Sequence, residues 1–168
     1  LREVELVPFA AFARARLSSL MTAHVIFEAL EPDKPATMSK VVLDALLRKE
    51  LGFEGVLVSD DLEMKAIADH YSLEQAVVDG VNAGVDLFPV CHRAQVQRVA
   101  IAALVKAVED GRVTRARVDE ALGRLEALAR RFARGPEDLI ATLGSEEHRS
   151  LAAGLDAGTF AGKDPTER

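Results

Sequence analysis

Two adjacent carboxylates, Asp60 and Asp61, come one residue after a short apolar run at residues 56–58. The run comes after a glycine and consists of Val and Leu, which is typical of a buried parallel strand. Sheets of parallel strands place ligands and catalytic groups at the carboxyl ends of those strands. Because neighbouring strand residues point to opposite faces, only one of the two carboxylates is expected to face such a site. The residues alone leave open a second interpretation, in which both are solvated loop acids or helix caps.

Polar side chains also occur at the ends of two further strand candidates, at residues 20–27 and 85–91. Convergence of such groups at strand ends is typical of the face of a sheet that carries an active site. Taken singly, His24 is more typical of a hydrogen-bonded structural histidine, and Cys91 of a small buried residue than of a thiol nucleophile. No HxH or HxxxH spacing supports a metal site, and the glycine-rich phosphate-binding loops are absent. The polar residues are Thr22, His24, Cys91, His92 and Arg93.

Helices are predicted between and after these strand candidates, from apolar residues at helical spacing and from capping residues. Strands that alternate with helices imply right-handed crossovers and a parallel sheet, so the fold class is α/β. Three parallel strands leave two open edges, which a closed eight-stranded barrel of about 250 residues would remove. The chain is expected to hold roughly the second half of such a barrel. The predicted helices cover residues 7–17, 39–51, 72–83, 95–109 and 114–132, and the last is an extra C-terminal helix.

Composition excludes several classes of protein. The 168 residues are 49% hydrophobic and 29% charged, which is ordinary for a folded domain with a core. A net charge of −6 without a long basic run argues against nucleic acid or a membrane surface as a partner. A single cysteine rules out an intrachain disulfide and favours a reducing compartment, so we expect a cytoplasmic protein. No signal peptide or membrane span is visible, and a start at Leu1 suggests the later part of a longer chain.

Several segments together resemble the second half of the N-terminal barrel of family 3 glycoside hydrolases. The most specific is the block Gly-Phe-x-Gly-Val-x-x-Ser-Asp, which ends at Asp60. The chain looks most like the bacterial β-N-acetylglucosaminidase (β-N-acetylhexosaminidase) branch, because the block continues as Asp61-Leu62 and then Met64. The matching segments are residues 6–9, 21–25, 35–39, 51–64, 83–87 and 90–92.

The resemblance implies a retaining hydrolase that releases terminal β-linked N-acetylglucosamine through a covalent glycosyl-enzyme, plausibly in peptidoglycan recycling. It assigns the nucleophile to Asp60 and makes Asp61 a supporting carboxylate beside it. Met21 and His24 are then expected in the wall of the sugar pocket. The family chemistry needs no metal ion and no organic cofactor. The expected partner is the carbohydrate substrate, an N-acetylglucosaminide, with self-association through the open strand edges as a further expectation.

The chain also departs from that family pattern. The acid/base histidine with its aspartate partner, and the Lys-His-Phe-Pro-Gly-His-Gly segment before it, do not occur in the 168 residues. The chain alone is therefore expected to be inactive, with a partial (β/α)8 barrel at residues 1–134 and a C-terminal extension and tail at 135–168. Two alternatives remain open: a non-catalytic half-barrel that self-associates through its open strand edges, and a small α/β ligand-binding domain.

Overall fold

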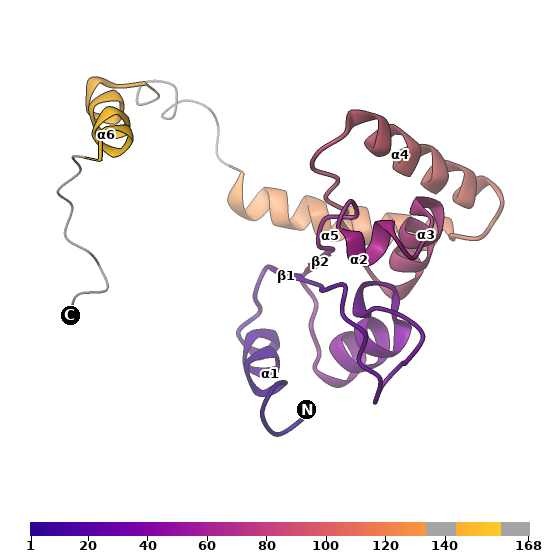
Figure 1. Ribbon diagram of the computed structural model, residues 1–168. Coiled ribbons are helices and arrows are strands. Elements are labelled where there is room, and N and C mark those ends of the chain that lie inside the picture. The colour runs from indigo at the N-terminus through magenta and orange to yellow at the C-terminus, as the bar shows by residue number, and fades with distance from the viewer. Residues whose placement is uncertain (134–143, 159–168) are drawn as a thin grey trace. The chain divides into compact units, whose positions relative to one another are not determined.

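The computed structural model describes residues 1–133 and 144–158, and the chain divides into two compact units. The first unit, Leu1–Phe132, holds two strands and most of the helices, and the second holds a single described helix, α6 (Glu146–Asp156) (Figure 1). No helix in these described ranges is long and apolar enough to cross a membrane. In chain order the first unit contains α1 (Val7–Arg14), β1 (Ser19–Met21), the 3-10 helix η1 (Ala36–Met38), the π-helix η2 (Val41–Glu50), β2 (Val56–Val58), α2 (Lys65–Ala68), α3 (Leu73–Ala83), α4 (Ala94–Glu109) and α5 (Arg115–Phe132).

The two strands β1 and β2 are parallel and pair Leu20 with Leu57 in the central position. Residues 22–55 connect them and include η1 and η2, so the helical crossover expected from the sequence is present. The predicted strand at residues 20–27 is shorter than expected. After Met21 the chain turns back on itself, with an antiparallel bridge between Ile26 and Pro35.

The third predicted strand, at residues 85–91, is not confirmed, because that segment forms only one parallel bridge, Val58 with Leu87. The bridge is extended by a hydrogen bond from the Ser59 amide to the Leu87 carbonyl, at 2.9 Å. Pro89 follows two residues later and has no N–H to donate, so the ladder cannot continue regularly. The segment still runs beside β2 and brings the residues after it to the carboxyl end of that strand.

The core of the first unit consists of apolar side chains that pack β2 against the helices. Leu57 is fully buried, and Phe53, just before the strand, is 1% exposed. A second cluster lies between η1, the segment after β2, and α3, where Leu62 and Ile67 pack against Val77. The first cluster comprises Ala13, Leu43, Phe53, Leu57, Ala83 and Val85, and the second Met38, Leu62, Ile67, Ala76 and Val77.

The helix boundaries follow from local capping chemistry. The Ser72 hydroxyl accepts the Gln75 amide at 3.1 Å, as the Ser-x-x-Gln pattern predicts, and Gly84 ends α3 with a φ of +125°. Ser145 caps α6 in the same way by accepting the amide of His148 at 3.2 Å. The sequence analysis did not predict α6. Of the predicted C-terminal extension and tail at 135–168, only residues 144–158 are among the described residues.

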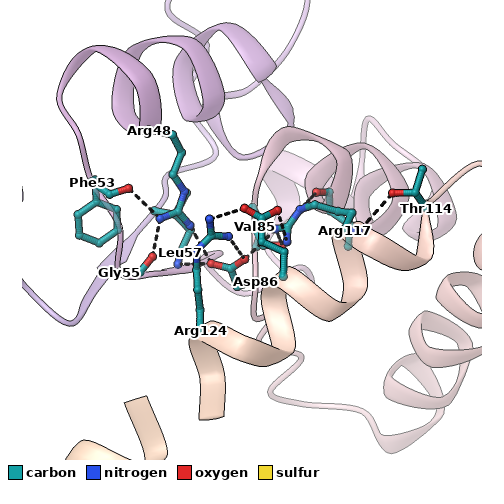
Figure 2. Close-up of polar contacts among 11 residues, drawn as sticks. Arg48, Phe53, Gly55, Leu57, Val85, Asp86, Thr114, Arg117 and Arg124 are labelled. Atoms are coloured by element: carbon teal, nitrogen blue, oxygen red, sulfur yellow. Dashed lines mark hydrogen bonds and ion pairs between the residues drawn. The ribbon is translucent and has the colours of Figure 1, made fainter. Parts of the chain in front are cut away.

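A buried ionic cluster around Asp86 joins β2 to η2 and α5 (Figure 2). The Asp86 side chain has no exposed surface. It accepts the Leu57 amide at 3.0 Å and pairs with Arg48 and Arg117 at 2.8 Å and with Arg124 at 3.1 Å. Burial lowers the pKa of Arg48 to about 10, and repulsion by Arg124 and Arg117 acts in the same direction, while Asp86 opposes it. The cluster fixes β2 close to its amino end, opposite the end that carries Asp60.

Candidate active site

The turn that follows β2 carries Asp60 with one oxygen left free. Ser59 is fully buried, and its hydroxyl donates to the Asp60 carbonyl at 2.7 Å. The Oδ1 atom of Asp60 accepts the Asp61 amide at 2.8 Å. Within residues 1–133 and 144–158, Oδ2 of Asp60 has no hydrogen bond or ion pair. Asp60 is therefore an oriented, partly exposed carboxylate with an oxygen available to a ligand.

Asp61 differs from its neighbour because both of its carboxylate oxygens have partners. Oδ1 accepts the amides of Glu63 at 3.0 Å and of Cys91 at 3.4 Å. Oδ2 lies 3.3 Å from Nε2 of His92, and the Asp61 side chain is only 14% exposed. The two adjacent carboxylates therefore have different environments, and Asp61 ties the turn after β2 to the loop that precedes α4.

Glu63 makes a second link between the same two segments. Its Oε2 accepts the amides of His92 at 2.7 Å and Arg93 at 3.1 Å, and its Oε1 accepts Nε of Arg93 at 2.6 Å. The Arg93 hydrogen bond, together with these two amides, lowers the pKa of Glu63 to about 2, against a smaller opposing effect of burial. The role of Glu63 was not predicted. The loop that it binds lies some 30 residues away, and a single sequence gives no signal that pairs that loop with the turn after β2.

His24 holds the loop after β1 against the turn that carries Asp60. Its Nε2 lies 3.1 Å from the Asp61 carbonyl oxygen, which can only accept, so Nε2 carries a proton. Its Nδ1 lies 2.9 Å from the Thr37 hydroxyl, which in turn lies 2.8 Å from the hydroxyl of Thr22. The sequence analysis selected His24 but missed Thr37, which is fully buried in η1.

Met21, the other predicted pocket-wall residue, lies elsewhere. Its side chain is 66% exposed and lines an apolar cavity of about 300 Å³ together with Phe9 and Phe27. Neither Asp60 nor His24 lines that cavity. The structure therefore brings His24 to the Asp60 turn and leaves Met21 on a separate apolar surface beside β1.

The geometry does not support the two other candidate chemistries, a thiol nucleophile at Cys91 and a metal site. Cys91 is exposed, and partial desolvation followed by the charge of Asp61 raises the pKa of its thiol, which disfavours a reactive thiolate. In the part of the chain that the structure describes, no group of three His, Cys, Asp or Glu side chains could hold a metal ion. Asp60 remains the residue whose geometry suits chemistry on a ligand.

A parallel strand pair with a helical crossover, and a carboxylate turn at the strands' carboxyl ends, define an α/β protein of the parallel-sheet class. Residues 1–128 match the model of the glycosyl hydrolase family 3 N terminal domain, a TIM-barrel-like α/β fold. The chain belongs to this family. The resemblance seen in the Gly-Phe-x-Gly-Val-x-x-Ser-Asp block is thereby confirmed.

The chain is also similar to individual relatives. It is 32% identical to β-hexosaminidase A of Pseudoalteromonas piscicida over 176 aligned positions, covering 92% of this chain and 29% of that protein. It is similar to the structure of a glycoside hydrolase family 3 β-N-acetylglucosaminidase from Paenibacillus sp. str. FPU-7, with a TM-score of 0.74 and 47% identity over 76% of this chain and 24% of the other. For the β-N-acetylglucosaminidase of Thermotoga maritima the TM-score is 0.73, with 31% identity over 79% of this chain and 29% of the other. The chain spans less than a third of the length of each of these relatives.

Proposed function

We propose that the chain is the C-terminal part of the (β/α)8 barrel of a retaining glycoside hydrolase that releases terminal β-linked N-acetylglucosamine. The single observation that carries the proposal is Oδ2 of Asp60 at the carboxyl end of β2, which has no partner among the described residues. The relatives named β-hexosaminidase and β-N-acetylglucosaminidase support the substrate class. Asp61 is a supporting carboxylate, because its oxygens already bind the chain on both sides.

In the proposed reaction, Oδ2 of Asp60 attacks the anomeric carbon of the sugar while the bond to the aglycone oxygen breaks. An acid protonates the leaving oxygen, and an ester between Asp60 and the sugar forms. Water, deprotonated by the conjugate base of that acid, then attacks the same carbon and frees Asp60. The hydrogen bond from the Asp61 amide to Oδ1 orients the carboxylate, and His24 binds the carbonyl oxygen of the same residue, Asp61.

The acid/base group of the proposed reaction is assigned by the family resemblance alone. The histidine–aspartate loop that supplies it in this branch is not among the 168 residues. We therefore expect the chain alone to be inactive. For the complete protein we propose a role in peptidoglycan recycling.

The test compares the complete gene product, including any residues that precede Leu1, with the 168-residue chain on an aryl N-acetylglucosaminide. The complete product should release the aryl group and the chain alone should not. Asp60→Ala should remove the activity of the complete product, whereas the exposed control Asp44→Ala should retain it. Appreciable turnover by the chain alone, or wild-type rates in Asp60→Ala, would contradict the proposal.

A second candidate is a non-catalytic module that self-associates beside β1. Large apolar side chains lie exposed in and after that strand, with Met21 at 66%, Val25 at 50% and Ile26 at 45%. Apolar surface of this kind, next to a strand paired on one side, favours association. Light scattering after size-exclusion chromatography distinguishes the two: a stable dimer of the chain would support this candidate, and a monomer would exclude it.

A further inference from the structure

Glu63 is a buried carboxylate that the proposed reaction does not use. Its side chain is only 4% exposed, and every partner that it has lies in the loop before α4. Together, Asp61 and Glu63 accept three consecutive backbone amides, those of Cys91, His92 and Arg93. Two carboxylates from one turn thus hold the backbone of a segment about 30 residues away.

We propose that Glu63 is a positioning residue for Asp60, acting through the backbone of the loop at residues 91–93 and through Asp61. The inference rests on the proposed function, since it names what keeps the nucleophile turn in place. The positioning depends on the hydrogen bonds that Glu63 accepts from the loop backbone, and not on its ion pair with Arg93.

Glu63 is the acceptor for the two loop amides nearest the start of α4. Arg93 is the residue before α4, and its side chain makes no capping hydrogen bond to that helix. The unpaired amides at a helix start favour a carboxylate, because the helix dipole is positive there. Glu63 supplies that carboxylate from outside the helix, by accepting the His92 and Arg93 amides.

The loop that Glu63 holds also binds the Asp61 carboxylate. Two of the three partners of the Asp61 carboxylate, the Cys91 amide and the His92 ring, come from the loop that Glu63 holds. Without the Glu63 side chain, the His92 and Arg93 amides lose their acceptor. The link between turn and loop then depends on the longer contacts of Asp61, at 3.4 Å to the Cys91 amide and 3.3 Å to the His92 ring, so the loop is held less firmly. The turn then loses its fixed geometry, and a misplacement of about 1 Å in a reacting group can cost ~100-fold in rate.

Three substitutions separate the backbone hydrogen bonds from the ion pair. Glu63→Gln keeps one side-chain oxygen for the two amides and loses the charge. Arg93→Ala removes the ion pair and keeps both backbone amides. Glu63→Ala removes every one of these bonds, so it alone should release the loop.

The experiment measures kcat and KM of the complete gene product on an aryl N-acetylglucosaminide. Glu63→Ala should lower kcat by about 10- to 100-fold with KM changed less than about threefold, since the reacting group and not the sugar contacts has moved. Glu63→Gln and Arg93→Ala should stay within about threefold of the wild type. A wild-type kcat in Glu63→Ala would overturn the proposal. A decrease in kcat in Arg93→Ala as large as that in Glu63→Ala would overturn it as well.

A second measurement, on the 168-residue chain itself, needs no activity. Hydrogen exchange of the His92 and Arg93 amides should be at least about tenfold faster in Glu63→Ala than in the wild type, and unchanged in Arg93→Ala. Unchanged exchange in Glu63→Ala would overturn the positioning role whatever the activity shows. A complete product that hydrolyses no N-acetylglucosaminide refutes the proposed function instead, and the exchange result then still reports whether Glu63 holds the loop.

Discussion

Replacing Asp86 by alanine tests how the strand beneath the site is held in place. Asp86 has no exposed side-chain surface, accepts the Leu57 amide and pairs with three arginines. The substitution leaves that amide without an acceptor and leaves three guanidinium groups together without their shared counter-charge (Figure 2). The arginines are 11–22% exposed, so water relieves only part of this loss.

The magnitude follows from these contacts. Removing one partner of a buried ion pair costs about 3–5 kcal/mol, and this range already includes much of the cost of the unpaired charge. The buried Leu57 amide adds to the loss, and the residual exposure of the arginines reduces it. We expect the free energy of unfolding to fall by about 4 kcal/mol. For a urea slope of about 2 kcal/mol per molar, the unfolding midpoint then falls by about 2 M.

The assay is urea unfolding followed by circular dichroism and by the fluorescence of Tyr71, the only tyrosine in a chain without tryptophan. Because Tyr71 lies in the first unit and packs against the Leu62 cluster, its signal reports on that unit. The matched control is Asp44→Ala, which removes an exposed pair with Lys49 and should cost about 0–1 kcal/mol. If Asp86→Ala lowers the free energy of unfolding by no more than Asp44→Ala does, the Asp86 cluster does not hold the strand in place.

Two further predictions concern the same unit. The pKa of Glu63 is lowered from 4.5 to about 2, so its ionised form stabilises the fold above pH 4.5 and this contribution is lost as the pH falls toward 2. The difference in unfolding free energy between the wild type and Glu63→Gln should therefore shrink between pH 5 and pH 2 in urea titrations, and a constant difference would contradict the assignment. Gly55→Ala would place a Cβ 2.6 Å from the Leu17 carbonyl oxygen and should destabilise by about 1–3 kcal/mol. In Gly123→Ala, in α5, the added Cβ meets no described atom within 4 Å, so this substitution should stabilise the fold by about 0.5–1 kcal/mol in thermal unfolding. Equal effects of Gly55→Ala and Gly123→Ala on stability would contradict both predictions.

The elements that could be predicted from the sequence are those with local causes. The Ser72 cap and the Gly84 stop define α3, and the Val-Leu-Val run defines β2, because each signal lies within or beside its element. Asp60 could be selected for the same reason, since only Ser59 separates it from that run. The Ser145 cap of α6 is an equally local signal, so that helix was predictable and was missed.

The features that could not be predicted depend on residues far apart in the chain. Residues 85–91 have a strand-like apolar pattern, and Pro89 within it already weakens the prediction of a strand, because it has no N–H for a ladder. How many of these residues pair with β2, however, depends on the backbone of that distant strand. The burial of Asp86 among three arginines, and the capture of the Arg93 amide by Glu63, join segments about 30 residues apart or more. A single sequence carries no pattern that pairs such positions, so these contacts appear only in three dimensions.

The most direct test of the central claim is to trap the covalent intermediate on Asp60. The complete gene product is incubated with a fluorinated N-acetylglucosaminide that forms its glycosyl-enzyme faster than water removes it, and the labelled peptide is sequenced by mass spectrometry. We expect one sugar on Asp60 and no label in Asp60→Ala. A label on Asp61 or on any other residue, or hydrolysis of the normal substrate by Asp60→Ala, would contradict this expectation.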